Sequence, residues 1–83
     1  MKVNLSKPVI KQLNKLPELV RRKCIYKIRE LVGLYTDHLN IRKLSNREGY
    51  RLRVGDYRVI YQLDKLKDEL VVMSVGHRRD VYE

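Results

Sequence analysis

The feature that most constrains the fold is the pair Gly55-Asp56, which separates two segments of alternating apolar and polar residues. Two-residue turns of this kind join antiparallel strands, because glycine and aspartate accept the backbone angles that such turns require. We therefore predict a β-hairpin made of residues 50–54 and 57–63. Since the turn has two residues, it also fixes which residues of the two strands face each other.

This register divides the hairpin into an apolar face and an arginine face. Arg53 lies opposite Arg58, and Arg51 lies opposite Ile60, and directly opposed residues share a face. Opposed like charges destabilise a sheet by up to about 1 kcal/mol per pair. One explanation is that acids of the 64–69 loop neutralise the arginines. The other is that fixed guanidinium groups form a phosphate-binding surface, which we favour because their forks match phosphate oxygens.

Two helices are expected before the hairpin, because apolar residues recur there at helical spacing. The first begins after Ser6, a favoured N-cap residue type, and ends at Pro17, which cannot continue a helix. The second carries an apolar stripe that runs from Val20 to Tyr35 and contains Cys24. We therefore interpret Cys24 as a small core residue and not as a nucleophile.

The remaining segments predict an α+β fold in a single domain, residues 1–83. Residues 2–5 suit a short edge strand, residues 36–48 are interpreted as irregular, and residues 70–75 predict a strand covered on both faces. The expected arrangement is a helical hairpin on one face of a small, mostly antiparallel sheet whose last three strands form a meander.

The end of the last strand is expected to lie beside the arginines. If Leu63 pairs with Leu70, Val75 comes to lie opposite Arg58. The polar and aromatic residues that follow are His77, Arg78, Arg79 and Tyr82. The sequence thus predicts a cationic site built from the hairpin and the C-terminal segment.

The charge balance narrows the class of partner. Nineteen Lys and Arg residues against ten Asp and Glu residues give a net charge of +9, with a pI of about 9.9. Such a balance favours nucleic acid, an anionic membrane surface or an acidic protein, unless the charges only solvate helix faces. The single cysteine excludes an internal disulfide and a multi-cysteine zinc site, which fits a reducing cytoplasm. We find neither a secretory signal nor an apolar run near the ~20 residues that span a bilayer, so no membrane partner is expected.

The residue types at this site suit RNA cleavage without metal or cofactor. The sequence has no metal-ligand spacing, glycine-rich phosphate loop or serine nucleophile motif. RNA supplies its own nucleophile, the 2′-OH, so the protein must position the phosphate, stabilise negative charge and move protons. Positive neighbours favour the ionised form of a tyrosine, which makes Tyr82 a candidate base, and His77 could also transfer a proton.

Two motifs resemble a known family. Residues 50–61, Tyr-Arg-Leu-Arg-Val-Gly-Asp-Tyr-Arg-Val-Ile-Tyr, and residues 75–82, Val-Gly-His-Arg-Arg-Asp-Val-Tyr, closely resemble the RelE/ParE superfamily of toxins, on the RelE side. The resemblance covers nearly the whole chain and implies the RelE-like microbial RNase fold. It also implies the toxin of a type II toxin-antitoxin system, a ribosome-dependent endoribonuclease (mRNA interferase) that cuts messenger RNA in the A site and inhibits translation.

The resemblance carries individual roles onto this sequence. Arg58 matches the arginine that contacts the scissile phosphate, Arg78 matches the arginine after the Val-Gly step, and Tyr82 matches the catalytic tyrosine. Arg51 and Arg53 fall where well-studied relatives carry lysines, and arginine donates a proton poorly. His77 therefore becomes the candidate proton donor. Further RNA contacts are expected from Arg51, Arg53, Arg42, Lys43, Arg47 and Arg79.

The resemblance also implies partners and leaves alternatives. The expected partners are an acidic RelB-like antitoxin, messenger RNA and the ribosome near the 16S rRNA of the A site, with a monomeric toxin entering a hetero-oligomeric complex. One alternative is a ParE-like toxin that inhibits DNA gyrase without catalysis. Another is an inactive RNA- or ribosome-binding protein that uses the basic helices of residues 7–15 and 21–29.

Overall fold

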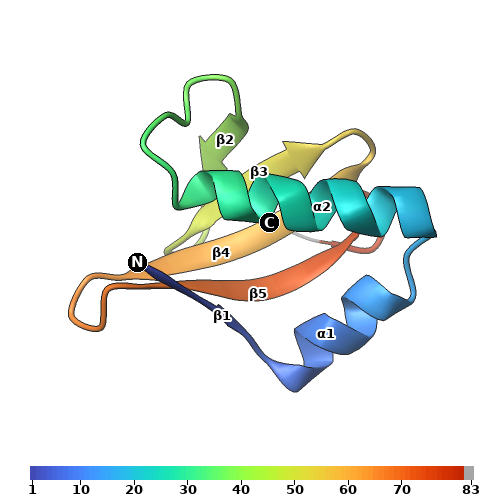
Figure 1. The fold of residues 1–83 in the computed structure, drawn as a ribbon, viewed down its shortest axis with the longest axis horizontal. Coiled ribbons are helices and arrows are strands. Elements are labelled where there is room, and N and C mark those ends of the chain that lie inside the picture. Colours follow the sequence, from blue (N-terminus) through green and yellow to red (C-terminus); the bar gives the residue numbers. More distant parts are fainter. Residues whose placement is uncertain (82–83) are drawn as a thin grey trace.

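The computed structural model describes residues 1–81 and confirms the α+β architecture (Figure 1). The elements in this range are β1 (Lys2–Leu5), α1 (Lys7–Asn14), α2 (Glu18–Leu31), β2 (Asn40–Lys43), β3 (Tyr50–Val54), β4 (Tyr57–Asp64) and β5 (Glu69–His77). The sheet has the order β1-β5-β4-β3-β2, with β1 parallel to β5 and every other neighbouring pair antiparallel. Strands β3, β4 and β5 form the predicted meander, and β1 is the predicted edge strand.

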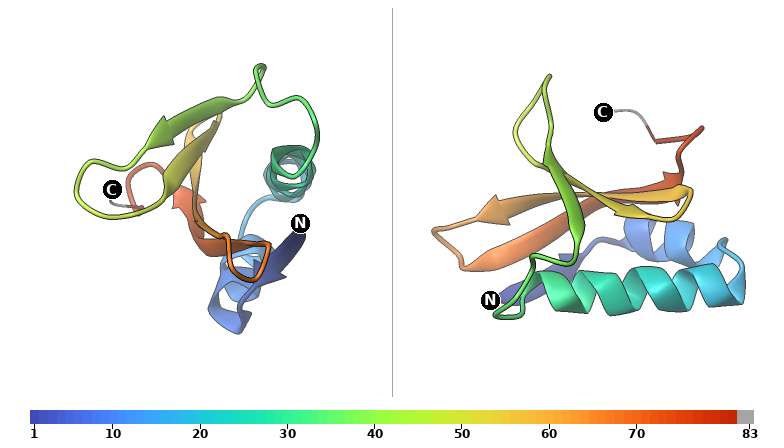
Figure 2. Two further views of the ribbon diagram at one scale, coloured as in Figure 1. Left: turned by 90° about the vertical axis from the view of Figure 1, so that its left-hand side faces the viewer. Right: turned by 90° about the horizontal axis from the view of Figure 1, so that it is seen from above.

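Both helices lie on the same side of the sheet, as expected (Figure 2). Their buried residues are Val9 and Leu13 on α1 and Cys24 and Ile28 on α2. These side chains pack with the apolar face of the meander in one core cluster. Burying each large aliphatic side chain contributes about 1.5–3 kcal/mol, so this interface supplies most of the driving force for folding. Burial also raises the pKa of the Cys24 thiol to about 11, which agrees with its predicted place in the core.

Both helices end earlier than the sequence predicts. Helix α1 ends at Asn14, and the N–H of Leu16 donates to Leu13 O at 3.1 Å in the turn that follows. Helix α2 ends at Leu31, so the apolar stripe stops there and Tyr35 is 80% exposed. The expectation that Tyr35 packs in the core is therefore wrong, because the chain leaves the helix before reaching it.

Strand β2 corrects the interpretation of residues 36–48 as irregular. Its four residues pair with β3, with Ile41 opposite Leu52 and Arg42 opposite Arg51. The sequence signal is weak because Ile41 is the one apolar residue of the strand, and hydrogen bonding to β3 provides the remaining order.

The pairing of β4 with β5 shifts at a β-bulge. Leu63 lies opposite Leu70 as predicted, but the register changes between Ile60 and Tyr61. Val75 consequently lies opposite Val59 and not opposite Arg58, which corrects the expected pairing. A bulge adds one residue to one strand, and an alternating pattern does not reveal where this happens.

Candidate nucleic-acid interface

Four arginines lie on the face of the sheet that points away from the helices. Arg53 is paired with Arg58, and Arg42 of β2 is paired with Arg51. Alternate residues of these strands, such as Leu52, pack in the helix-covered core, so the arginines point to the opposite side. We call Arg42, Arg51, Arg53 and Arg58 the arginine face. The predicted register of the hairpin is confirmed, and β2 extends it by one further arginine.

Two segments border the arginine face. The connection between β2 and β3 and the chain after β5 both project from this side of the sheet (Figure 2). Gly49 has a φ of 123°, and a Cβ there would lie 2.8 Å from Tyr61 O, so the connection packs closely against β4. The Gln62 side chain, on the arginine side of β4, donates from Nε2 to Glu48 O at 3.3 Å. The β2–β3 connection is therefore held against β4 at one border of the arginine face.

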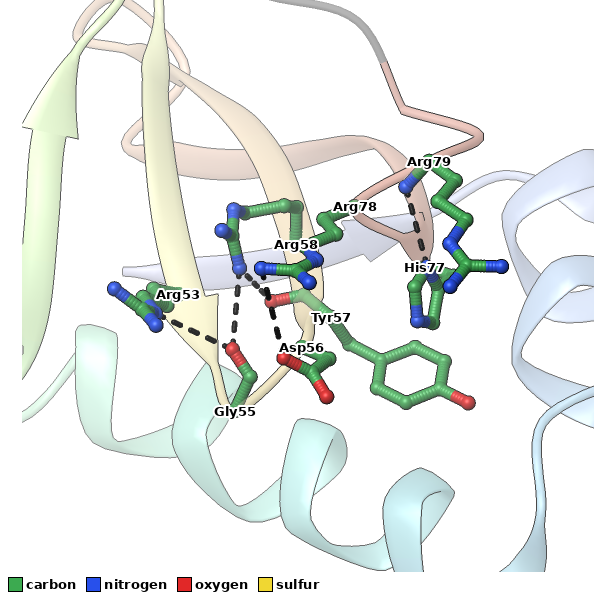
Figure 3. A network of polar contacts seen from close by, with 8 residues as sticks. All are labelled: Arg53, Gly55, Asp56, Tyr57, Arg58, His77, Arg78 and Arg79. Atoms are coloured by element: carbon green, nitrogen blue, oxygen red, sulfur yellow. Dashed lines mark hydrogen bonds and ion pairs between the residues drawn. The ribbon is translucent and has the colours of Figure 1, made fainter.

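Backbone carbonyls of the hairpin turn orient two of the arginines. Gly55 O accepts hydrogen bonds from Arg53 Nε at 3.3 Å and from Arg58 Nη1 at 3.2 Å (Figure 3). Tyr57 O accepts a third hydrogen bond from Arg58 Nη1, at 3.1 Å. A neutral carbonyl orients a guanidinium without cancelling its charge. The acids near the 64–69 loop lie at the opposite end of β4, where Asp64 pairs with Glu69.

The hairpin turn also holds the start of the C-terminal segment. Arg78 donates its backbone N–H to Asp56 O at 2.8 Å, and its guanidinium Nη1 lies 4.0 Å from Asp56 Oδ1. Both side chains are more than half exposed, so the ion pair itself is weak. The backbone bond is the firmer link, and it places Arg78 beside the turn that orients Arg53 and Arg58. The contact between Asp56 and Arg78 could not be predicted from the sequence, because the two residues are distant in the chain.

His77 lies on the helix-facing side of the sheet, away from the arginine face. It pairs with Tyr57, and the two rings make an edge-to-face contact with centroids 5.2 Å apart (Figure 3). The backbone N–H of Arg79 donates to His77 Nδ1 at 3.2 Å. In a neutral imidazole whose Nδ1 accepts, Nε2 carries the proton. The structure thus brings Arg51, Arg53, Arg58 and Arg78 to one region but does not bring His77 to the arginine face.

The other sequence-predicted RNA contacts are more dispersed. Lys43 is exposed at the end of β2, Arg47 is exposed in the connection to β3, and Arg79 is exposed in the turn after β5. Tyr82 lies outside the described residues. Within residues 1–81, no helix is long and apolar enough to span a membrane, and no three His, Cys, Asp or Glu side chains gather as a possible metal site.

Comparisons with known proteins agree with this architecture. The family model described as ParE toxin of type II toxin-antitoxin system, parDE, matches residues 3–82. The archaeal RelE-RelB complex from Pyrococcus horikoshii OT3 contains a chain with 27% identity and a TM-score of 0.74, over 96% of this chain and 97% of that one. The RelB-RelE complex from Methanococcus jannaschii gives 26% identity and a TM-score of 0.77, over 95% and 94%. The isolated E. coli RelE toxin, at 24% identity and a TM-score of 0.72 over 92% and 82%, shares the fold. A comparison with curated protein sequences finds no significant match.

Proposed function

Since the chain belongs to the ParE toxin family of type II toxin-antitoxin systems, within the RelE/ParE superfamily, we propose that it is a RelE-like toxin that cleaves messenger RNA on the ribosome. The observation that carries this proposal is the arginine face, with Arg53 and Arg58 oriented by the turn and Arg78 held beside them. A fixed group of guanidiniums is suited to gripping a phosphodiester. Gyrase binding by itself does not require guanidiniums oriented toward a scissile phosphate.

In the proposed reaction the RNA 2′-oxygen attacks the adjacent phosphorus, and the bond from phosphorus to the 5′-oxygen breaks. The products are a 2′,3′-cyclic phosphate and a 5′-hydroxyl. Arg58 would hold the scissile phosphate, and Arg78 would stabilise the negative charge that builds up on its oxygens. Tyr82, which matches the family's catalytic tyrosine, would accept the 2′-OH proton. Arg51 and Arg53 would contribute further charge, with Arg42, Lys43, Arg47 and Arg79 along the RNA path.

The leaving 5′-oxygen needs a proton donor, and His77 is the proposed candidate. To donate, the imidazole has to be the cation, in which both ring nitrogens carry protons. Protonation would therefore break the hydrogen bond that His77 Nδ1 accepts from Arg79. The RNA would also have to reach around the end of β5 to meet the ring.

The proposed partners are an acidic antitoxin, messenger RNA and the ribosomal A site, in the cytoplasm. The solved relatives from P. horikoshii and M. jannaschii are RelE-RelB complexes, which supports a RelB-like antitoxin here. The net charge of +9 favours an acidic segment lying over the arginine face. Association with it should slow as salt is raised, because salt screens electrostatic steering.

A second function is inhibition of DNA gyrase without catalysis. The observation in its favour is that the matching family model is that of the ParE toxin. In that case the arginine face would bind protein or DNA, and its loss would weaken binding without affecting message integrity.

The deciding experiment adds the purified protein to a cell-free translation reaction and maps message ends by primer extension. We expect cuts within codons, reduced about 10²–10³-fold by Arg78→Ala, the usual cost of removing a group that stabilises developing charge. Tyr82→Phe should also slow cleavage, whereas Arg22→Ala on the helix side is the control for net charge. Intact message at concentrations that stop growth, together with inhibited gyrase supercoiling, would overturn the nuclease proposal in favour of the second function.

A further inference from the structure

A pocket of about 520 Å³ lies at the outer edge of β5, beyond the part of the edge that β1 covers. Strand β1 pairs with residues 69–72 of β5, so the edge that follows is not covered by a strand. There the C-terminal end of α1 crosses, and Gln12 Oε1 accepts the N–H of Val75 at 2.9 Å. This hydrogen bond gives the edge N–H of Val75 a partner and ties α1 to β5. The pocket is therefore part of the folded framework, and its size is within the ~300–1,000 Å³ range of small-molecule sites.

The pocket extends around the edge of β5 toward the arginine side. His77 and Tyr57 line it from the helix side, whereas Gly76, which also lines it, is the cross-strand partner of Arg58. A Cβ on Gly76 would lie 2.9 Å from Val81 Cγ2, so the chain after β5 packs directly over this glycine. Neighbouring strands are about 4.8 Å apart. One wall of the pocket is thus a single strand away from the residue proposed to hold the scissile phosphate.

The lining of the pocket combines ring faces, an apolar wall and polar groups of both signs. Tyr57 and His77 supply the rings, and Val75 and Leu16 are among the apolar residues. The bond from Arg79 to His77 Nδ1 leaves Nε2–H as the donor of the neutral ring. Lys15 and Asp80, both exposed, add a cation and a carboxylate. A flat ligand with apolar faces and an edge of donors and acceptors satisfies all of these groups, and nucleobases have this chemistry.

We propose that this pocket binds the base of a nucleotide adjacent to the phosphate held by Arg58, and that it sets the sequence preference of cleavage. The proposal rests on the proposed function, because it needs RNA on the arginine face. In this pocket His77 donates Nε2–H to the base and keeps its bond from Arg79, and this role replaces its candidacy as the proton donor. Lys15 and Ser74, which lie outside the two motifs, become specificity-determining residues together with Asp80.

Binding can be tested without any cleavage, by titrating the ¹⁵N-labelled protein with AMP, GMP, CMP, UMP and inorganic phosphate. We expect inorganic phosphate to shift amides of the hairpin turn near Arg58. Nucleotides should in addition shift the amides of Lys15, Ser74 and His77, with different affinities for the four bases. If every nucleotide produces only the shifts that phosphate produces, the base-pocket proposal is overturned.

Two pairs of variants make this test specific. Ser74→Leu fills the pocket and should weaken nucleotide binding about 10–200-fold, the scale for a mismatched apolar pocket, whereas Ser74→Ala leaves the space open. Lys15→Ala should weaken it as well, and Lys11→Ala, one helical turn earlier and also exposed, is the matched control. The response to inorganic phosphate should persist in all four variants, which also reports that they are folded. Equal nucleotide affinity in Ser74→Leu and Ser74→Ala, and in Lys15→Ala and Lys11→Ala, would contradict the proposal.

The same variants test the sequence preference in the cell-free cleavage assay. Ser74→Leu should redistribute cuts among codons relative to Ser74→Ala. An unchanged distribution, with cleavage intact, overturns the role in specificity. If the wild-type protein cleaves no message at all, the nuclease function is overturned. Nucleotide binding by the pocket can still be measured in that case. The two proposals therefore fail in different experiments.

Discussion

The two faces of the β3–β4 hairpin are formed by the same strands, but they contribute in opposite ways to stability. On the helix side, Leu52 and Val59 are completely buried and belong to the core cluster. On the other side, Arg53 and Arg58 are opposed and share the carbonyl oxygen of Gly55. One face lowers the free energy of folding by removing apolar surface from water, whereas the other holds like charges together at a cost. Because the arginine face does not stabilise the fold, we expect it to serve function.

The largest predicted effect is on the helix side. Leu52→Ala should reduce the free energy of unfolding by about 2–5 kcal/mol, because it leaves a cavity among buried side chains. Urea denaturation measures this change. Arg53→Ala on the same strand is the control, and it should not lower stability, because it removes one of two opposed like charges. Equal losses in the two variants would show that the faces do not differ as described.

The second effect is on activity and follows from the proposed function. Arg58→Ala should lower the rate of message cleavage about 10²–10³-fold, because it removes a preorganised donor to the phosphate. Arg58→Lys should recover little of this loss, since an ammonium group cannot form the same bidentate contact. Single-turnover cleavage on programmed ribosomes gives the rates. Wild-type rates in Arg58→Ala would remove the arginine face from the mechanism.

The third effect concerns the cost of the opposed arginines. Raising salt from about 0.05 to 0.5 M should stabilise wild type more than Arg53→Gln, by up to about 1 kcal/mol, because salt screens the repulsion between Arg53 and Arg58. Arg22→Gln is the matched control, since Arg22 Nη2 lies 2.8 Å from Glu18 Oε1 in an attractive pair. Its removal should change the salt response in the opposite direction. The same salt response in both variants would mean that the opposed pair carries no net repulsion.

The smallest effect tests a charged pair far from the arginine face. The hydrogen bond between His38 and Glu30 lowers the pKa of the Glu30 carboxyl, and the charges of His38 and Lys27 lower it further. Because the folded-state pKa is depressed, the stabilisation is present above the unfolded pKa, near 4.5, and is lost as pH falls through the folded value. Between about pH 5 and 3, wild type should therefore lose slightly more stability than His38→Ala. Urea midpoints across this range measure the difference, and parallel curves would rule out the contribution.

The hairpin is the part of the fold that sequence predicts best. Gly55-Asp56 and the alternation around it give the strand pairing residue by residue, and all the predicted opposite pairs in the hairpin are present. Local chemistry decides this, because a two-residue turn leaves one register that keeps the apolar side chains on one face. Strand β2 and the end of α2 near Tyr35 are different. Strand β2 has a single apolar residue to mark its buried face, whereas the apolar stripe of α2 continues to Tyr35 although the helix ends at Leu31.

The candidate site is predictable only in part, for a related reason. The grouping of Arg51, Arg53 and Arg58 follows from the alternation of the strands, so sequence alone places them together. The position of His77 does not, because the bulge in β5 shifts its register against β4 by one residue and places it opposite Tyr57. A shift of one residue moves a side chain to the other face of a sheet. That is why a residue two positions from Val75 faces the helices and not the arginines.

The sequence by itself determined the α+β class, the hairpin register and the concentration of positive charge on one face. These properties depend on neighbours within a few residues, where turn geometry and periodicity act. Only the tertiary structure decided that Gly55 O lies between Arg53 and Arg58 and that Asp56 O holds Arg78. The pocket at the edge of β5 also depends on the tertiary structure. Gln12 and Val75 are 63 residues apart in the chain and meet only when α1 packs on the sheet.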